Sequence, residues 1–299
     1  MSGSQKRFSI ILAAYNVEKY IGEALKSVIN QTYENYEIIV VDDCSTDDTM
    51  KVVKQYNDKR IKVYSTKANT KTAGAPRNIG LQHAKGEYIL FLDGDDRLYN
   101  NKVLEKINKL IGNDVYDILY LGYQDMGNGD KLRMSNDENS TKKARILCDV
   151  TFSVSSRCWN REFINRNNMR FIESMYYEDE VFTMTANILV EKTICGDFPI
   201  FYYRRNRKGS VMTTPTIKKC SDFYRALAAI VDLIEITPEK YKPYLLSFIK
   251  NESEIIPLKV KAILKSLIHK TGTPVFPKRE FDYDDFMEEI FNSNNSLKN

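Results

Sequence analysis

The chain has 299 residues, of which 28% are charged, and a formal net charge of +4. This length suits one large domain, or two smaller ones, with a substantial hydrophobic core. The charge is too small to indicate a nucleic-acid-binding protein. No apolar run reaches the roughly 18 residues that a membrane-spanning helix needs. Residues 1–4 contain no apolar signal core, so we expect a cytoplasmic protein.

Cysteine and histidine usage narrows the chemistry further. The five cysteines lie far apart and form no C-x-x-C pair, so we expect free thiols in a reducing compartment. The two histidines, His83 and His269, are too few for a histidine-rich zinc site. A Ser-His-Asp triad would have to use one of them. Chemistry is therefore expected to rest on carboxylates, arginines and a metal ion.

The first 120 residues or so alternate between strand and helix patterns. Short apolar runs predict buried strands over Phe8–Ala13 and Glu37–Val41, and further strands over Ile61–Tyr64 and Tyr88–Leu92. Helical spacing and capping residues predict helices over Ile21–Ile29, 47–56 and Ala75–Ala84. Such alternation predicts an α/β fold with a mainly parallel sheet flanked by helices. In these sheets ligands bind at the carboxyl ends of the strands.

The pattern changes after Ile111. Polar residues over Gln124–Ser140 indicate a loop or hairpin, and short mixed elements follow to about residue 215. From about residue 216 the chain is expected to be helical. The predicted helices there are Asp222–Ile236, Tyr244–Lys250 and Leu258–Lys270.

The acidic segment Asp93–Asp96 (DGDD) follows directly after a predicted strand. Two carboxylates spaced i, i+2 on a rigid strand end can point into one site. Mg²⁺ and Mn²⁺ commonly bind one or two such carboxylates together with substrate phosphates. A solvated acidic turn is the alternative interpretation, because Asp-Gly is common in turns.

Three further segments carry polar groups with more than one interpretation. Asp43, after the second strand, would either help to cap the next helix or accept from a base N–H or a ribose hydroxyl. Arg77, in the first turn of a helix, is either a surface arginine or a phosphate ligand. The run Glu178–Glu180 would either complement a helix dipole or supply a carboxylate that removes a proton from a sugar hydroxyl.

Together, and in this order, these segments resemble family 2 glycosyltransferases with the GT-A fold. The resemblance rests on SIILAAYN (9–16), SVINQT (27–32), VVDDCSTDDT (40–49), GAPRNIGL (74–81), GEYILFLDGDD (86–96) and YEDEVF (177–182). It is strong over residues 8–120 and looser over 150–212. The APRN sequence (75–78) is most similar to bacterial wall-polymer and capsule transferases of this family.

The resemblance implies an inverting enzyme that moves a sugar from a UDP-sugar to a hydroxyl of a cell-surface glycan, polymer or lipid-linked acceptor. It also implies a GT-A catalytic domain over residues 1–215, with a nucleotide-sugar half at 8–120 and an acceptor half at 121–215. Mn²⁺ or Mg²⁺ would be the cofactor. The helical region 216–299 has no counterpart that we identify in the family.

The resemblance also assigns roles to individual residues. Asp179 would be the general base and Asp95 the metal ligand. The donor would be bound by residues that line the base pocket or contact uracil, pyrophosphate, ribose or metal: Ala14, Tyr15, Asn16, Asp43, Arg77, Asp93 and Gly94. For Arg77, pyrophosphate and the nearby carboxylates are both open as partners. A diphosphate or acceptor loop would involve Glu178, Arg204, Arg207 and Ser210.

Two rival functions stay open. One is a nucleotidyltransferase or another nucleotide-binding α/β enzyme, although the chain has neither a G-x-G-x-x-G motif after the first strand nor a P-loop. The other is a non-catalytic module that binds a glycan or a partner. The presence of both Asp95 and Asp179 argues against the second.

The segment Leu258–Lys270 has an apolar stripe surrounded by lysines. Such a helix can lie on an anionic membrane surface, which would place the protein at the inner face of the cell membrane. Packing on the catalytic domain or on another subunit is the favoured alternative. The oligomeric state is not predicted by the sequence.

Overall fold

The computed structural model describes residues 7–126, 132–134, 153–205 and 216–271, with side chains up to Val260 in the last range. The strands of the described residues are β1 Phe8–Ala14, β2 Tyr36–Asp42, β3 Ile61–Ser65, β4 Tyr88–Asp93, β5 Arg97–Leu98, β6 Ile118–Met126, β7 Leu132–Met134, β8 Arg157–Asn160 and β9 Thr193–Arg204. The α-helices are α1 Ile21–Ile29, α2 Thr49–Val53, α3 Gly74–His83, α4 Val103–Ile111, α6 Arg161–Arg166, α7 Glu178–Leu189, α8 Ile217–Asp232 and α9 Lys242–Thr271. Short 3₁₀ turns are η1 Val154–Ser156 and η3 Glu239–Tyr241.

All strands of the described residues belong to one sheet, in the order β3-β2-β1-β4-β8-β6-β9-β5, with β7 on β6. The strands β1 to β4 are mutually parallel, as the sequence predicts. The apolar runs of β1, β2 and β4 are buried on both faces, which is typical of parallel strands covered by helices, whereas the edge strand β3 is partly exposed. The register aligns Ala14 with Asp42 and Ala13 with Asp93, so the carboxyl ends of β1, β2 and β4 meet at one edge.

The second half of the sheet is mixed. Strand β8 is antiparallel to both β4 and β6, whereas β9 is parallel to β6 and antiparallel to β5. The sequence predicts either a loop or a hairpin over Gln124–Ser140. In the structure β6 and β7 pair antiparallel, with Gln124 opposite Leu132, as in a hairpin. The predicted α/β class is confirmed, with the parallel arrangement concentrated in the first four strands.

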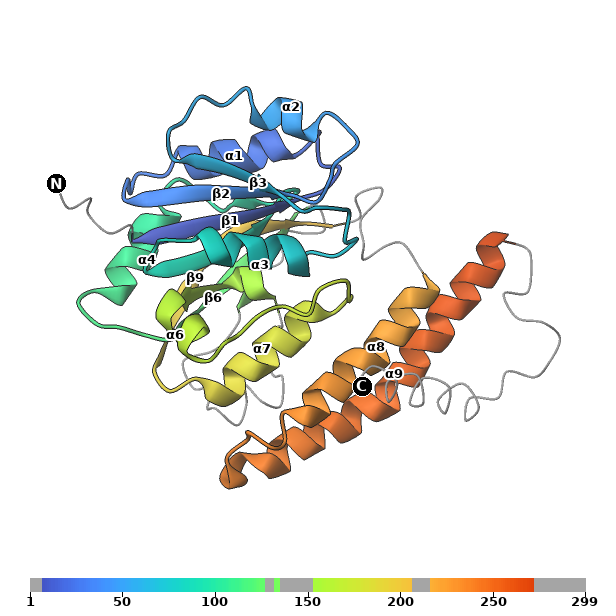
Figure 1. The fold of residues 1–299 in the computed structure, drawn as a ribbon. Helices are drawn as coiled ribbons and strands as arrows, with labels where there is room; N and C mark the ends of the chain where they lie inside the picture. The colour runs from blue at the N-terminus through green and yellow to red at the C-terminus, as the bar shows by residue number, and fades with distance from the viewer. Residues whose placement is uncertain (1–6, 127–131, 135–152, 206–215, 272–299) are drawn as a thin grey trace.

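Helices cover both faces of the sheet, and each face has its own core (Figure 1). Alternate side chains of β1 serve different cores: Ile10 packs with α1 and α4, and Ile11 packs on the face that carries α3, α6 and α7. Gly80 of α3 allows that close approach, because a Cβ atom there would lie 2.3 Å from the Ile11 side chain.

The predicted end of α2 is wrong. The sequence analysis extends this helix to Tyr56, whereas α2 ends at Val53. After Val53 the chain continues in tight turns, and the Tyr56 hydroxyl donates to the Gly22 carbonyl oxygen at 3.0 Å. This tertiary contact ties the turn to α1 in place of another helical turn. The sequence leaves Asp43 as a possible cap for the helix after β2. In the structure Asp47 has this role, because its carboxylate accepts the Thr49 backbone N–H at 3.0 Å.

The C-terminal helices α8 and α9 lie side by side and extend away from the sheet (Figure 1). Several helix boundaries predicted for this region are wrong. α8 begins earlier and ends earlier than Asp222–Ile236, and the two predicted helices after it form one continuous α9 that contains Pro257. Proline removes one helical hydrogen bond. Packing keeps the helix continuous, because Ile256 and Val260 are buried in one cluster with Cys220 of α8.

Part of the predicted amphipathic segment 258–270 is therefore covered by protein. Val260 is buried against α8, whereas Leu258 is 67% exposed. Lys259 forms an ion pair with Glu252 at 3.0 Å, and the side chains of residues 261–270 lie outside those described. Within the described residues, no helix is both long and apolar enough to cross a bilayer.

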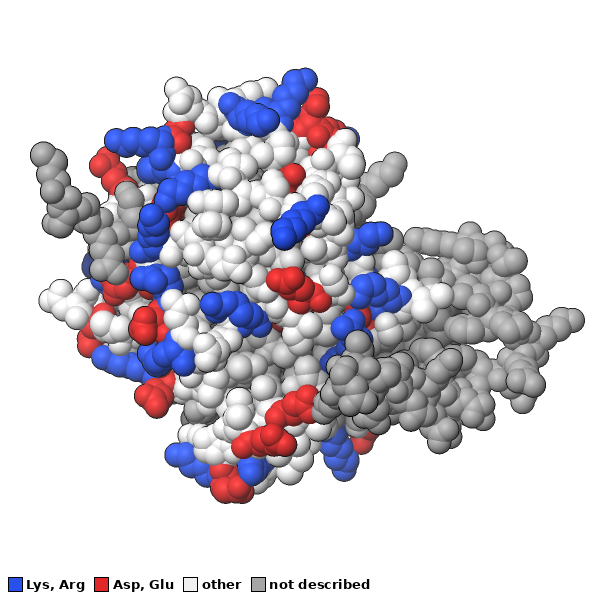
Figure 2. Space-filling view, in the orientation of Figure 1, with Lys and Arg blue, Asp and Glu red and all other residues white. Residues whose placement is uncertain are grey.

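Basic and acidic side chains are interspersed over the face of the molecule drawn in Figure 2. This mixed pattern, seen for the described residues of that face, accords with the small net charge of +4.

Candidate functional site

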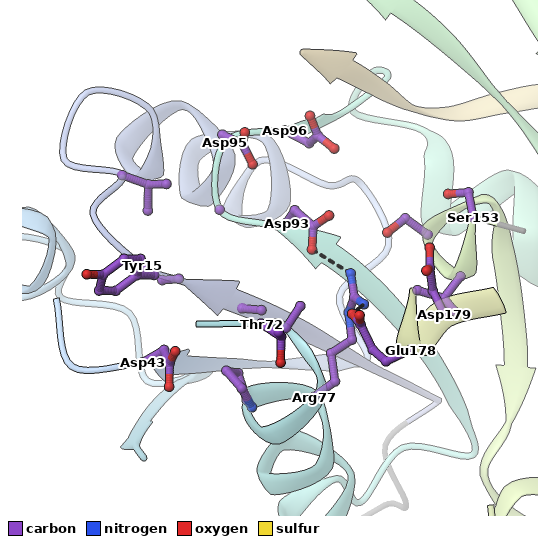
Figure 3. Close-up of a pocket in the computed structure, with 18 of the residues that line it drawn as sticks. Tyr15, Asp43, Thr72, Arg77, Asp93, Asp95, Asp96, Ser153, Glu178 and Asp179 are labelled. Carbon is purple, nitrogen blue, oxygen red and sulfur yellow. Dashed lines mark hydrogen bonds and ion pairs between the residues drawn. The ribbon is translucent and has the colours of Figure 1, made fainter. Parts of the chain in front are cut away.

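A cavity of about 870 Å³ opens at the carboxyl ends of β1, β2 and β4. The start of α7, the end of β9 and the start of α8 also line it. Figure 3 shows Tyr15 and Asp43 toward one end of the cavity, Glu178 and Asp179 toward the other, and Arg77 between them. The structure thus brings the predicted donor residues and the predicted base together around one space.

The end of β1 supplies the predicted base-pocket residues Ala14, Tyr15 and Asn16, all of which line the cavity. The Tyr15 side chain is 41% exposed, so its ring is open to a ligand. Asn16 has a left-handed backbone (φ 48°), and its side-chain oxygen accepts the Thr46 N–H at 2.8 Å. Asn16 therefore fastens the loop after β1 to the loop after β2.

Asp43 is 2% exposed, and its carboxylate is already hydrogen-bonded within the chain. It accepts the backbone N–H of Thr70 at 2.9 Å, that of Lys71 at 3.1 Å, and the Thr66 hydroxyl at 2.8 Å. A carboxylate offers about four acceptor positions. Asp43 thus organises the loop between β3 and α3, and its predicted contact with uracil would share the carboxylate with these donors.

Arg77 joins the two ends of the cavity. Its side chain is 6% exposed and donates to Asp93 at 2.9 Å and to Glu178 at 2.8 Å. Burial alone would lower the pKa of Arg77, but the nearby carboxylates outweigh it and raise that pKa. Of the partners that the sequence leaves open for Arg77, the structure gives carboxylates. Gly74, at the start of α3, allows the backbone at Ile172 to approach this helix closely, because a Cβ atom on Gly74 would lie 2.7 Å from the Ile172 carbonyl oxygen.

Two buried donors near Arg77 have no hydrogen-bond partner among the described residues. They are the Nε of Arg77 and the hydroxyl of Thr72, and both residues line the cavity. A buried polar group without a partner is costly. Neither atom is satisfied by the described residues, although both residues border the cavity.

The acidic turn after β4 faces the same cavity. Gly94 donates its N–H to the Ala13 carbonyl oxygen at 2.9 Å, and a Cβ atom there would lie 3.0 Å from the Val17 side chain. Asp96 is 2% exposed and accepts the Arg204 backbone N–H at 2.8 Å. Burial raises the pKa of Asp96 well above its usual range, and the charges of Asp95 and Asp93 add to the shift.

The carboxylates of this turn fit a hard divalent cation in chemical type. Asp93, Asp95 and Asp96 all line the cavity, and their crowded negative charge raises the pKa of Asp96. Among the residues described, no three Asp, Glu, His or Cys side chains are arranged as a complete metal site. The donor set suits a site of one or two carboxylates that substrate phosphates complete, as is common for Mg²⁺.

The guanidinium of Arg204, predicted for a diphosphate loop, lines the cavity but is engaged by the protein. It donates to the Asp95 carbonyl oxygen at 2.9 Å and to Glu23 at 2.6 Å. Arg204 thus supports the acidic turn. The other predicted loop residues, Arg207 and Ser210, lie outside the described residues.

The acidic run at the start of α7 divides into different environments. Glu178 is buried on Arg77, and burial together with Asp179 raises its pKa to about 8 against the opposing charge of Arg77. Asp179 lines the cavity and is partly exposed; burial raises its pKa, with Arg77 opposing and Asp93 adding. Burial and then Asp179 raise the pKa of Glu180 to about 8. Glu178 and Asp179 both line the cavity, but the Glu178 carboxylate is paired with Arg77, so Asp179 is the better placed of the two to act on a ligand.

Several cavity residues are missing from the sequence prediction. Asp96 was adjacent to the predicted metal ligand, so the DGDD motif itself carried the signal. Thr216 and Lys219 of the α8 end also line the cavity, and burial lowers the pKa of Lys219. No local pattern identifies them, because only the packing of α8 on α7 brings them there.

Comparison with known proteins gives a matching family and matching folds. The family model described as "Glycosyl transferase family 2" matches residues 9–169. Among solved structures, the first 349 residues of S. aureus TarS in complex with UDP align with a TM-score of 0.67 and 29% identity, covering 81% of this chain and 70% of that one. A mannosyltransferase from Pyrobaculum calidifontis in complex with GDP-Man and Mn²⁺ aligns with a TM-score of 0.58 at 17% identity and shares the fold, covering 90% of this chain and 76% of that one. The predicted fold is confirmed.

Curated relatives include two enzymes named for a wall polymer. Poly(ribitol-phosphate) beta-N-acetylglucosaminyltransferase TarS of Staphylococcus aureus is 30% identical over 230 residues, covering 75% of this chain and 40% of the relative. Poly(ribitol-phosphate) beta-glucosyltransferase of Bacillus spizizenii is 31% identical over 237 residues, covering 77% of this chain and 37% of the relative. The chain thus spans about two fifths of the length of these relatives.

Proposed function

Because the chain belongs to glycosyl transferase family 2, as the sequence motifs predicted, we propose that it transfers a sugar from a UDP-sugar to a hydroxyl of a bacterial cell-surface polymer, with inversion at the anomeric carbon. One observation carries this proposal. Asp179 lines the same cavity as Tyr15, Asp93 and Asp95, so a basic carboxylate faces the residues suited to a nucleotide donor.

The donor occupies the strand-end side of the cavity. The exposed ring of Tyr15 offers a surface on which uracil stacks, and the loop held by Asp43 forms the edge of this pocket. Thr72 and Arg77 line the cavity beside this pocket, and the positive charge of Arg77 favours the diphosphate there. Solved structures of the similar TarS contain UDP and UDP-GlcNAc, which supports the choice of nucleotide.

Asp95 and Asp93 would hold Mn²⁺ or Mg²⁺ at this end of the cavity. When bound, the cation neutralises charge that develops on the leaving diphosphate. Asp96 supports this turn through its bond to the Arg204 backbone, and Gly94 keeps the turn close to β1. The cavity residues of the turn thus orient the donor so that its anomeric carbon faces Asp179.

Asp179 removes the proton from the acceptor hydroxyl as that oxygen attacks the anomeric carbon and the bond to the diphosphate breaks. Glu178 is the less suitable base, because its carboxylate is buried on Arg77 at 2.8 Å. The raised pKa of Asp179 makes it a stronger base than an ordinary aspartate.

The acceptor is a hydroxyl-bearing surface polymer, and the names of the curated relatives favour a polyol phosphate such as poly(ribitol phosphate). The acceptor enters the cavity from the side formed by α7 and α8, where Lys219 supplies a cation. A neutral polysaccharide is the alternative within the same reaction class.

A screen of UDP-sugars for UDP release, with and without Mn²⁺, tests the proposal. The best donor is then offered poly(ribitol phosphate) and neutral glycans, and the product is identified by mass spectrometry. UDP with Mn²⁺ should raise the melting temperature more than GDP or CMP, since a ligand of the native state stabilises it by mass action. Nucleotide transfer, or glycan binding without any turnover of UDP-sugars, would replace the proposal by one of its rivals.

A further inference from the structure

The segment that leads into the acidic run has an unusual backbone. Ser174 and Tyr177 both have left-handed conformations, with φ of 56° and 65°. A bulky residue such as tyrosine rarely adopts this region, and such conformations persist only where surrounding contacts enforce them. Tyr177 immediately precedes α7, so its conformation sets the direction in which the first turn of that helix begins.

Polar contacts from α8 hold this segment. The Asp222 carboxylate is fully buried and accepts the Tyr176 backbone N–H at 2.9 Å. Lys218 forms an ion pair with Asp222 and donates to the Ser174 carbonyl oxygen at 2.6 Å. The backbone groups of Ser174 and Tyr176 belong to the turn that precedes α7, and the side chains that bind them come from α8.

An aromatic contact acts on the next residue. The rings of Tyr177 and Phe223 are stacked with centroids 3.9 Å apart and planes 17° apart. Phe223 is 8% exposed. Within the described residues, neither Phe223 nor Asp222 lines the cavity, so each reaches it only through the segment that it holds.

We propose that α8 positions the catalytic base: Asp222 and Phe223 fix Tyr176 and Tyr177 so that Asp179, in the first turn of α7, points at the reacting atoms. The inference rests on the proposed function, in which Asp179 is that base. It gives the C-terminal helical region a task in catalysis and makes Phe223 a positioning residue that touches no substrate.

The variant Phe223→Leu removes the stacked ring while it keeps a buried apolar side chain. Phe248→Leu is the matched control, because Phe248 is buried in the α8–α9 packing with Ile230 and Leu245. We expect Phe223→Leu to lower kcat by about tenfold, since small misplacements of a reacting group slow a reaction strongly. The KM for the UDP-sugar should stay within about twofold, and Phe248→Leu should leave both parameters close to wild type.

Introducing the same change into Asp179→Asn separates positioning of the base from a general loss of structure. If Phe223 acts through Asp179, Phe223→Leu should slow the Asp179→Asn enzyme by less than about twofold, because coupled residues are not additive. A further tenfold loss in that background would overturn the proposal.

Hydrogen exchange of the amides of residues 174–180 supplies a readout that needs no turnover. Exchange there should be faster in Phe223→Leu than in wild type and in Phe248→Leu. Equal exchange in the two variants would overturn the proposal. If wild type transfers no sugar from any UDP-sugar, the proposed function fails, whereas this exchange comparison still decides whether α8 holds the segment.

Discussion

The two sides of the cavity are built by different kinds of interaction. On the strand-end side, Ala14, Asp43 and Asp93 lie where they do because parallel strands in register end together. On the other side, Glu178 reaches the cavity through an ion pair with Arg77, 101 residues earlier in the chain. In the proposed function the strand-end side is the donor side, and the side formed by α7 is the acceptor side. The donor side is determined by local sequence and sheet geometry, whereas the acceptor side depends on contacts between distant segments.

The largest effect should come from the acidic turn of the donor side. In the proposed function Asp95 binds the cation that offsets the charge of the leaving diphosphate, and this stabilisation is worth several kcal/mol in the transition state; Asp95→Asn weakens that binding. UDP release should therefore fall by about 10³-fold or more.

Excess EDTA should have the same effect on wild type, with recovery on addition of Mn²⁺. Asp48→Asn is the control, because its side chain is 65% exposed and lies outside the cavity. Full turnover of wild type in excess chelator would contradict the metal assignment.

Breaking the link between the two sides should cost stability. Arg77→Met leaves Glu178 buried without its partner, and removal of one member of a buried ion pair typically costs about 3–5 kcal/mol. Urea unfolding measures the change. In a Glu178→Gln background the same substitution should cost clearly less, because the buried carboxylate is gone.

The exposed pair Lys192–Asp114, with side chains 54% and 61% exposed, supplies the control for that experiment. Lys192→Met should leave the free energy of unfolding close to that of wild type, because solvent screens this pair. If Arg77→Met lowered the free energy of unfolding as little as Lys192→Met, the link between the two sides would be unimportant for folding.

The contrast between the two sides also explains what the sequence predicted. The strands β1 to β4 were predictable because each is a short apolar run, and the site residues follow them directly. The motif order identified the family, and it predicts Asp179 as the base. The continuity of α9 through Pro257 was not predictable, because it depends on the packing of Ile256 against Cys220 of α8.

The chemical partners of the site residues were also beyond local sequence. Arg77 was open to phosphate or carboxylate, and only the fold brings Asp93 and Glu178 to its guanidinium. Lys219 carries no motif, and the packing of α8 beside α7 places it at the cavity. These are consequences of tertiary contacts, which sequence spacing does not encode.

A smaller effect should appear in the pH dependence of stability on the acceptor side. The pKa of Glu180 is about 8 in the folded protein, above its ordinary 4.5, so the folded state holds a proton that the unfolded chain has released. This contribution to stability is present below pH 4.5 and is lost as pH rises through about 8.

Glu180→Gln cannot ionise, so its melting temperature should rise relative to wild type between pH 5 and 8, on the order of 2–4 °C. The same comparison with Glu239→Gln, which replaces a side chain that is 87% exposed, should be flat across this range. A melting-temperature gap for Glu180→Gln that shrinks as pH rises would contradict the assigned direction.

The most direct test of the account compares single amide substitutions across the acidic run, with kcat and donor affinity measured separately. Asp179→Asn should lower kcat for sugar transfer by about 10² to 10⁴-fold and leave the Kd for the UDP-sugar nearly unchanged, because a base contacts the acceptor hydroxyl. Glu180→Gln should be milder. Near-normal transfer by Asp179→Asn, with Glu178→Gln or Glu180→Gln inactive, would contradict the account and move the base to a neighbouring residue.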